Sequence, residues 1–293
     1  MRFLKGHGTG NDFVVLPDPD GALTLTPELA RSLCDRRFGI GADGVLRVVR
    51  TARADTGLDA EQAGRAEWFM DHHNADGSTA EMCGNGIRLY ARYLAGAGLA
   101  PPGSHVIATR GGLRTVTIPV GGGDVTVDMG PPVPAPARGT ATGTTQTATL
   151  GGTRVRGVAV SMGNPHLVCA VEDVRSFDLT APLTVSDEAF PDGVNLEIFE
   201  WTSHEVPPSP PAGDPLSVRG SVRMRVLERG VGETLSCGTG ACAVAVVALD
   251  RPGSALEVDV PGGRLVVTWT DSTLLLRGPA QIVAEGTWCG VVT

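Results

Sequence analysis

The chain has 293 residues, of which 42% are hydrophobic, and it contains 40 glycines. This length predicts two domains with a sizeable core, and the frequent glycine predicts strands joined by tight turns. The formal net charge of −8 and the lack of a basic run argue against a nucleic-acid partner or an anionic membrane surface. No signal segment or bilayer-length apolar stretch stands out, which predicts a cytoplasmic protein with reduced cysteines.

The apolar pattern predicts three helices in chain order. The first has Thr26 as N-cap, Pro27 at its first position, and runs towards Arg37. The second begins at Cys83 and carries one apolar face, and the third begins at Cys237 and is apolar all round, as expected for a buried helix. Alternating segments predict strands at Arg114–Ile118, Val125–Met129, Val222–Leu227, Leu256–Val260, Leu265–Trp269 and Ile282–Ala284.

Two stretches rich in proline and glycine predict irregular structure. Residues 130–152 are expected to connect the domains and to contain one short strand, and residues 207–215 are expected to form a surface excursion. The insertion at residues 51–65 carries no motif with a clear function.

The two halves of the chain resemble each other. Gly-Asn-Asp-Phe-Val-Val at 10–15 matches Gly-Asn-Pro-His-Leu-Val at 163–168, and Cys-Gly-Asn-Gly at 83–86 matches Cys-Gly-Thr-Gly at 237–240. Both pairs of motifs are separated by nearly the same length of chain. This repeat predicts two similarly folded domains, related by a pseudo-twofold axis, with the active site in a cleft between them.

Two helices that begin at a cysteine suggest acid–base chemistry. A helix N-terminus presents backbone N–H groups and a positive dipole, which bind a carboxylate and lower the pKa of a nearby thiol. A thiolate on one side of an α-carbon and a thiol on the other would make a racemase or epimerase. A pyridoxal phosphate enzyme needs a lysine, and the single lysine of this chain, Lys5, lies in a predicted strand.

Other classes of function fit the cysteines less well. None of the six cysteines forms a CxxC pair, so neither a disulfide framework, a redox pair nor a metal site is expected. Cys34, Cys169, Cys242 and Cys289 are expected to be small core residues. A racemase acting on proline or another amino acid is the nearest alternative, because it would keep Cys83 and Cys237.

The sequence resembles diaminopimelate epimerases over nearly its whole length. The matching motifs occur in one order, at residues 6–13, 35–44, 74–78, 81–86, 162–166, 193–195, 228–234 and 237–243. The resemblance implies a cofactor-independent isomerase that converts L,L-diaminopimelate to the meso form, in lysine and peptidoglycan precursor synthesis. It also implies an α/β fold of two domains, 1–130 plus 281–293 and 131–280, each a mostly antiparallel sheet wrapped around a central helix. Homodimers are implied as well.

The resemblance also implies a set of site residues. Cys83 and Cys237 match the two acid–base residues, and His166 and Glu228 match residues beside the catalytic centre. The substrate-binding residues that it implies are Asn11, Asn74, Gly84, Asn85, Asn164, Asn195, Glu228, Arg229, Gly238 and Thr239. A second amino-acid end on the substrate explains the need for Glu228, Arg229 and the asparagines Asn11, Asn74, Asn164 and Asn195, because asparagine and arginine bind ammonium and carboxylate groups. Asp12, Asp43 and Asp76 are expected to be structural turn residues instead.

Overall fold

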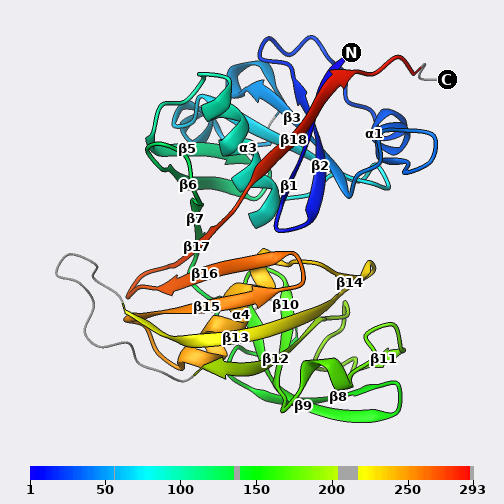
Figure 1. Ribbon diagram of the computed structural model, residues 1–293, viewed down its shortest axis with the longest axis vertical. Helices are drawn as coiled ribbons and strands as arrows, with labels where there is room; N and C mark the ends of the chain where they lie inside the picture. Colours follow the sequence, from blue (N-terminus) through cyan, green and yellow to red (C-terminus); the bar gives the residue numbers. More distant parts are fainter. Residues whose placement is uncertain (56, 135–138, 204–216, 291–293) are drawn as a thin grey trace. The chain divides into compact units, whose positions relative to one another are not determined.

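The chain forms two compact units in the computed structural model, which describes residues 1–55, 57–134, 139–203 and 217–290 (Figure 1). One unit holds Met1–Val127 and Gly278–Thr293, and the other holds Asp128–Arg277. The boundaries inferred from the sequence, after residues 130 and 280, lie a few residues from these divisions. Strands dominate both units, so the predicted α/β class is confirmed. Within the described ranges no helix is long and apolar enough to cross a membrane.

Among its described residues the first unit has eight strands, the seventh of which runs on into the second unit, and three α-helices. The strands are β1 (Arg2–Gly8), β2 (Asn11–Pro17), β3 (Gly44–Arg50), β4 (Trp68–Asn74), β5 (Gly103–Thr109), β6 (Gly112–Ile118), β7 (Val125–Gly130) and, from the end of the chain, β18 (Gln281–Thr287). The helices are α1 (Pro27–Cys34), α2 (Ala60–Gly64) and α3 (Gly84–Gly96), with a 3₁₀ turn η1 at Thr51–Arg53.

In the part of the second unit that the structure describes lie the remaining strands and one α-helix. The strands are β8 (Thr145–Leu150), β9 (Thr153–Ser161), β10 (Pro165–Ala170), β11 (Leu183–Thr184), β12 (Asn195–Ser203), β13 (Val218–Glu228), β14 (Gly232–Thr234), β15 (Ser254–Val260), β16 (Gly263–Trp269) and β17 (Leu274–Gly278). The helix is α4 (Gly238–Leu249), and η2 is a 3₁₀ turn at Val174–Ser176.

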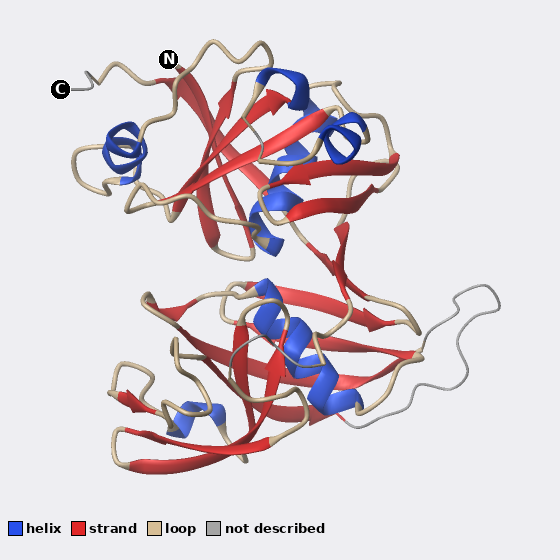
Figure 2. Ribbon diagram, turned by 180° about the vertical axis from the view of Figure 1, so that it is seen from behind, coloured by secondary structure: helices blue, strands red, loops and turns tan. Residues whose placement is uncertain are grey.

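In each unit the strands lie around one long helix (Figure 2). In the first unit this is α3, whose Ile87, Tyr90, Ala91 and Leu94 are buried, as the period of its apolar residues predicts. In the second unit it is α4, whose apolar sequence fits a helix that is surrounded by strands. Asp250 ends α4 in the left-handed conformation.

The two units share one pattern of strand pairing. In the first unit β2 pairs with β3 in parallel and β3 pairs with β4 in antiparallel fashion. In the second unit β10 pairs with β12 in parallel and β12 pairs with β13 in antiparallel fashion. The repeat seen in the sequence is therefore also a repeat of three neighbouring strands. It puts the start of β2 and the end of β4 at one sheet end, and likewise the start of β10 and the end of β13.

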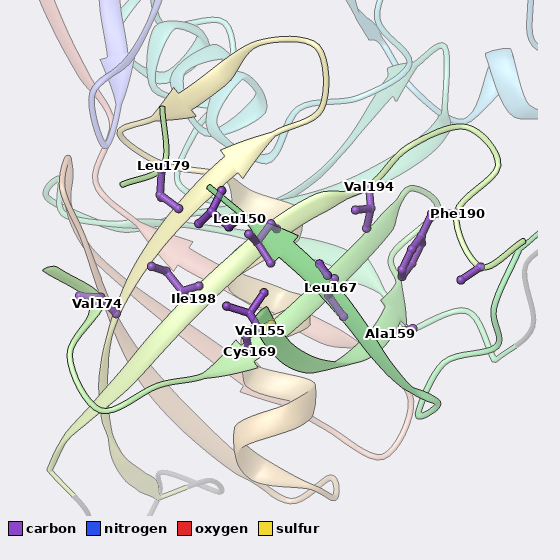
Figure 3. Close-up of a cluster of buried hydrophobic side chains, with 13 residues drawn as sticks. Leu150, Val155, Ala159, Leu167, Cys169, Val174, Leu179, Phe190, Val194 and Ile198 are labelled. Atoms are coloured by element: carbon purple, nitrogen blue, oxygen red, sulfur yellow. The ribbon is translucent and has the colours of Figure 1, made fainter. Parts of the chain in front are cut away.

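The two faces of the central strands in the second unit pack against different parts of the structure. Leu167 and Cys169 on β10, with Leu196 and Ile198 on β12, belong to a buried apolar cluster that also includes Leu150, Val155 and Phe190 (Figure 3). His166 and Glu197 lie at alternate positions of the same strands and therefore point to the opposite face. That face is the one that packs against α4, because a Cβ on Gly240 would lie 2.6 Å from Oε1 of Glu197.

Some expectations for individual segments need correction. Helix α1 ends at Cys34 rather than near Arg37, because Oδ1 of Asp35 accepts hydrogen bonds from the backbone N–H groups of Arg37 and Phe38 and starts a turn. The connection at 130–152 contains β8, as predicted, while its residues 135–138 lie outside the described part. The predicted surface excursion at 207–215 also lies outside the described residues.

Candidate active site

Each of the two cysteines caps the N-terminus of a long helix. Cys83 is the N-cap of α3, and its Sγ accepts a hydrogen bond from the N–H of Gly86 at 3.3 Å. Cys237 is the N-cap of α4, and its Sγ accepts from the N–H of Gly240 at 3.4 Å. Both sulfur atoms therefore lie at the positive end of a helix dipole, where a thiolate is stabilised and an anion binds.

Cys83 lies beside two of the predicted asparagines. Its thiol donates to Oδ1 of Asn11 at 3.6 Å, and Nδ2 of Asn85 donates to the same oxygen at 3.3 Å. Asn85 is buried and its Oδ1 accepts a hydrogen bond from Arg88, which is fully buried in the next turn of α3. The structure thus brings Asn11, Cys83 and Asn85 together, with Gly84 as the first residue of the helix.

The side chain of Asn11 is oriented by acidic residues that the sequence assigned to turns. Nδ2 of Asn11 donates to Oδ2 of Asp43 at 2.8 Å, which leaves Oδ1 facing Cys83. Arg36 bridges Asp43 and Asp12, and Lys5 also binds Asp12. Although partial burial opposes it, hydrogen bonds from Arg36 and Lys5 hold the pKa of Asp12 well below its usual range.

Asn74 lies at the same sheet end but makes its own contact. It is the last residue of β4 and pairs with Gly44, which in turn pairs with Phe13 of β2. Its Nδ2 donates to Oγ of Ser78 at 3.0 Å, in a turn where Asp76 accepts from the backbone and hydroxyl of Ser78. Asp76 is therefore a turn residue, as predicted.

A chain of polar side chains leads from Cys237 into the interior of the second unit. Sγ of Cys237 lies 3.4 Å from Oγ1 of Thr239, which accepts from Nδ2 of Asn164 at 3.4 Å. Oδ1 of Asn164 lies 3.0 Å from Nε2 of His166, and Nδ1 of His166 lies 2.7 Å from Oε1 of Glu197. The side chain of His166 is fully buried and contacts two side chains rather than a backbone carbonyl.

The other predicted residues of this unit lie where β12 begins and β13 ends. Oδ1 of Asn195 accepts from the backbone N–H of Arg229 at 2.9 Å, and its Nδ2 donates to the carbonyl of Pro165. The guanidinium of Arg229 donates to the carbonyl of Asp192 at 2.8 Å. Oε1 of Glu228 accepts a hydrogen bond from Oγ1 of Thr234.

A pocket of about 560 Å³ adjoins this segment. Its walls include Glu228, Arg229 and Glu233, together with the apolar side chains of Leu179 and Val194. The predicted pair Glu228 and Arg229 therefore lies at a hollow in the surface of the second unit, large enough for a small molecule.

The surroundings of Cys237 act on its thiol in opposite directions. Burial raises the pKa of Cys237 well above its ordinary value, and the negative charges of Glu228 and Glu197 raise the pKa further. Hydrogen bonds from Thr239 and from the N–H of Gly240 lower the pKa by a smaller amount. The expected lowering by the helix is thus outweighed, and Cys237 is held as a thiol.

The other four cysteines divide into two kinds. Cys34, Cys169 and Cys242 are buried, and burial raises the pKa of both Cys34 and Cys169 to about 12, as fits inert core residues. The expectation of a core position is wrong for Cys289, which is exposed.

Two residues of this arrangement were not identified from the sequence. Glu197 lies under the first turn of α4 and binds His166, and Thr234 binds Glu228. A signal for Glu197 exists, because it is a charged residue in the otherwise apolar run Leu196–Phe199. Across the part of the chain that the structure describes, no group of three or more His, Cys, Asp or Glu is arranged to hold a metal ion.

Comparisons with known proteins point to one family. The family model of diaminopimelate epimerase matches residues 3–134 and 158–283. The diaminopimelate epimerase of Thermobifida fusca is 48% identical over 98% of this chain and 97% of its own length. That of Mycolicibacterium smegmatis is 45% identical over 98% of this chain and 96% of its own length.

Solved structures share the fold at low identity. A PhzF-family phenazine biosynthesis protein of Bacillus anthracis matches with a TM-score of 0.61 at 15% identity, and covers 98% of both chains. A hydroxyproline epimerase from Agrobacterium vitis matches with a TM-score of 0.61 at 16% identity, covering 98% of this chain and 91% of its own. At these identities the likeness concerns the two-domain α/β fold alone.

Proposed function

Because this chain belongs to the diaminopimelate epimerase family, we propose that it converts L,L-diaminopimelate to meso-diaminopimelate without a cofactor. The observation that carries the proposal is the matched pair of cysteines. Each caps a long helix, and each sulfur accepts a hydrogen bond from an N–H of the first turn. A matched pair is what inversion requires, since each face of the α-carbon needs its own acid–base group.

The proposed reaction moves one proton off the α-carbon and another onto it. The thiolate of one cysteine removes the α-proton, so that an S–H bond forms as the C–H bond breaks. The thiol of the other cysteine then donates its proton to the opposite face, and a new C–H bond forms as its S–H bond breaks. Negative charge develops on the substrate carboxylate between these steps, and the first-turn N–H groups of α3 and α4 stabilise that charge.

The remaining residues are assigned to binding. Asn11 contacts Cys83 and Asn85 binds the same amide oxygen, while Thr239 contacts Cys237 and Asn164 binds Thr239, which supports the assignment of these side chains to orienting the reacting end. Asn74, Asn195, Glu228 and Arg229 are assigned to the amino-acid ends of the substrate. His166 and Glu228 are assigned to the surroundings of the reacting carbon.

The environment of the single lysine supports a reaction without pyridoxal phosphate. That cofactor needs a lysine amine to form a Schiff base. Nζ of Lys5 is instead engaged with Oδ2 of Asp12 at 2.5 Å and with the carbonyl of Gly41. Its role in the first unit is thus to hold the acidic residues that orient Asn11.

Wider roles follow from the proposed reaction and stay predictions. The meso product is the precursor expected for lysine and peptidoglycan synthesis, and we expect the enzyme to be cytoplasmic. The resemblance also predicts a homodimer, and sedimentation of the purified protein at micromolar concentration would measure its mass.

Proton NMR in D₂O with L,L-diaminopimelate and no added cofactor tests the reaction and the substrate together. The proposal predicts that the meso isomer accumulates and that the first meso product carries deuterium at one α-position only. Exchange at the α-carbon of proline, with none in diaminopimelate, would contradict the proposed substrate.

Substitution of either cysteine tests the proposed acid–base pair. Cys83→Ala and Cys237→Ala are each expected to lower kcat by at least about a thousandfold, because one face of the carbon loses its proton carrier. Cys242→Ala, in the second turn of α4, is the matched control, since Cys242 is buried in the apolar part of the helix. Turnover near the wild-type rate in either of the first two variants would refute the scheme.

A further inference from the structure

Glu197 is a buried carboxylate that the proposed reaction does not use. It lies on β12, and its side chain and that of His166 are both fully buried. Removing a carboxylate from water is costly unless a cation or several hydrogen bonds compensate. The contacts of Glu197 should therefore show what compensates its burial.

His166 is the group that binds this carboxylate. Oε1 of Glu197 lies 2.7 Å from Nδ1 of His166, while Oε2 is buried with no hydrogen-bond partner among the described residues. One neutral hydrogen bond compensates a buried carboxylate poorly, whereas an imidazolium supplies both a strong hydrogen bond and a positive charge.

The second ring nitrogen of His166 gives an independent indication. Nε2 lies 3.0 Å from Oδ1 of Asn164, and an amide oxygen can only accept a hydrogen bond. The amide is oriented this way because its Nδ2 donates to Oγ1 of Thr239 at 3.4 Å. A neutral imidazole carries one N–H and cannot donate to two oxygens, but an imidazolium carries two.

We propose that Glu197 is a positioning residue that holds His166 as an imidazolium, which donates to Glu197 from Nδ1 and to Asn164 from Nε2. The groups around this pair are Asn164 beside β10, Cys169 on β10, whose thiol the charge of Glu197 reaches, and Cys237 and Thr239 at the start of α4; Glu228 on β13 acts on Cys237 in turn. Oε1 of Glu197 and Oδ1 of Asn164 can both accept a hydrogen bond, so the two contacts of the ring fit an imidazole that carries a proton on each nitrogen.

The proposal fixes the direction of every hydrogen bond between Glu197 and the sulfur. His166 donates to Asn164, and Asn164 donates to the hydroxyl oxygen of Thr239. The hydroxyl proton of Thr239 is then left to donate to Sγ of Cys237, which lies 3.4 Å away. In this way Glu197 acts on the thiol through three intervening side chains, and it places a positive charge near the N-terminus of α4.

Nitrogen NMR of the histidine rings tests the protonation directly. In ¹⁵N-labelled protein without substrate at pH 7.5, both ring nitrogens of His166 are expected to carry a proton, with the signals assigned by their loss in His166→Gln. A single protonated nitrogen on His166 in the wild-type protein would overturn the proposal, and this measurement needs no variant at position 197.

Two variants on one strand test the role of Glu197. In Glu197→Gln the ring is expected to lose one proton, because the negative charge that stabilises the imidazolium is gone. Glu200→Gln is the control, since Glu200 is a buried carboxylate on the other face of β12 that binds Arg223 and the N–H of Val174. Two protonated nitrogens in Glu197→Gln would contradict the proposal.

The effect of Glu197→Gln on turnover rests on the proposed function, and the pH dependence of kcat/KM identifies this effect. Glu197→Gln is expected to lower kcat/KM at least about tenfold at pH 8 and by less at pH 6, because acid restores the imidazolium. A loss that is equal at both pH values would indicate a merely structural role and would contradict the proposal. If the wild-type protein epimerises nothing, the proposed function fails, whereas the NMR result on His166 still decides the positioning role.

Discussion

Cys83 and Cys237 occupy equivalent helix positions, but different side chains surround their sulfur atoms. Cys83 is half-buried beside the amides of Asn11 and Asn85, whereas Cys237 is buried beside the carboxylates of Glu228 and Glu197. The amide oxygen that Cys83 contacts carries no net charge, so it disfavours a thiolate less than the two carboxylates near Cys237 do. The two cysteines are therefore expected to differ in reactivity when no substrate is bound.

Alkylation rates would reveal this difference. At pH 7.5 without substrate, iodoacetamide is expected to modify Cys83 at least about tenfold faster than Cys237, because the thiolate is the reactive form and burial with two carboxylates disfavours it at Cys237. Mass spectrometry of the two peptides over time gives both rates, and the exposed Cys289 serves as an internal reference. Equal rates, or faster reaction at Cys237, would contradict this reading of the two environments.

Thr239 is expected to assist Cys237 through its hydroxyl group. Thr239→Val keeps the shape of the side chain but removes the donor that lowers the pKa of Cys237, so the pKa of the thiol should rise and kcat/KM should fall about tenfold. Thr239→Ser keeps the hydroxyl and should stay within about threefold of the wild-type rate. The pH dependence of Cys237 alkylation measures the shift, and an unchanged profile in Thr239→Val would count against the assigned hydrogen bond.

The sequence was sufficient to identify site residues that lie in short motifs. It was not sufficient for residues whose role depends on a partner that only folding brings near. Cys83 and Cys237 could be predicted because Cys-Gly-x-Gly recurs at a helix start. Glu197 could not be assigned a partner, since its neighbour His166 lies on a different strand. Asp43 was predicted as a turn residue, and only the structure shows that it orients the side chain of Asn11.

At the scale of elements, the two long helices were easier to predict than the central strands, while the five-residue α2 in the 51–65 insertion was not predicted. Helix α3 has an apolar face with a clear period, and α4 has a capping motif and a continuous apolar run. Strands β3, β4 and β12 are buried on both faces over most of their length, so their side chains lack the alternation that identifies a strand. These are also the strands whose ends carry Asn74 and Asn195.

The two helix starts tolerate a side chain differently. A Cβ on Gly240 would lie 2.6 Å from the buried Oε1 of Glu197, whereas a Cβ on the equivalent Gly86 would meet its neighbours at 3.4 Å, an ordinary contact. Gly240→Ala is therefore expected to destabilise the protein by about 1–3 kcal/mol. Gly86→Ala should be neutral or stabilising by up to about 1 kcal/mol, because alanine favours a helix.

Urea unfolding of the two glycine variants gives the comparison, with circular dichroism as the signal. The midpoint of Gly240→Ala should lie below that of Gly86→Ala, because only the Cβ at position 240 meets a buried carboxylate oxygen. Equal midpoints would show that Glu197 moves away freely, which would also weaken its assignment as a fixed partner of His166.

At the scale of the whole molecule, buried charge makes stability depend on pH. Asp71 binds Arg47, Arg110 and His73 in the interior of the first unit. Although burial alone would raise its pKa, the hydrogen bond from His73 and the charge of Arg110 lower the pKa of Asp71 to about 2. The adjacent His72 is fully buried, and burial followed by the charges of His73 and Arg110 lowers its pKa to about 4.

Moderate acid is expected to destabilise the protein through His72. In the unfolded chain this ring takes up a proton near its ordinary pKa of about 6.5, but in the folded chain only near 4, so the unfolded state binds more protons between these values. The contribution of His72 to the free energy of unfolding is fully present above pH 6.5. It should fall by about 3 kcal/mol as the pH drops to 4.

Urea midpoints at pH 7.5, 6 and 5 test this assignment. His72→Gln should flatten the fall of the midpoint with decreasing pH, whereas His105→Gln, at an exposed contact with Pro101, should leave the wild-type slope. A wild-type slope in His72→Gln would show that another group causes the loss of stability.

The isotope content of the first product tests most directly the claim that Cys83 and Cys237 serve opposite faces of one carbon. In D₂O, with a few per cent of L,L-diaminopimelate converted, two separate proton carriers predict meso product that carries deuterium at the inverted carbon. The unreacted substrate should then still carry protium, because the removed proton and the donated deuteron reside on different sulfur atoms. Product that keeps the protium of the substrate at the inverted carbon would mean that one group moves the proton across, and would contradict the account.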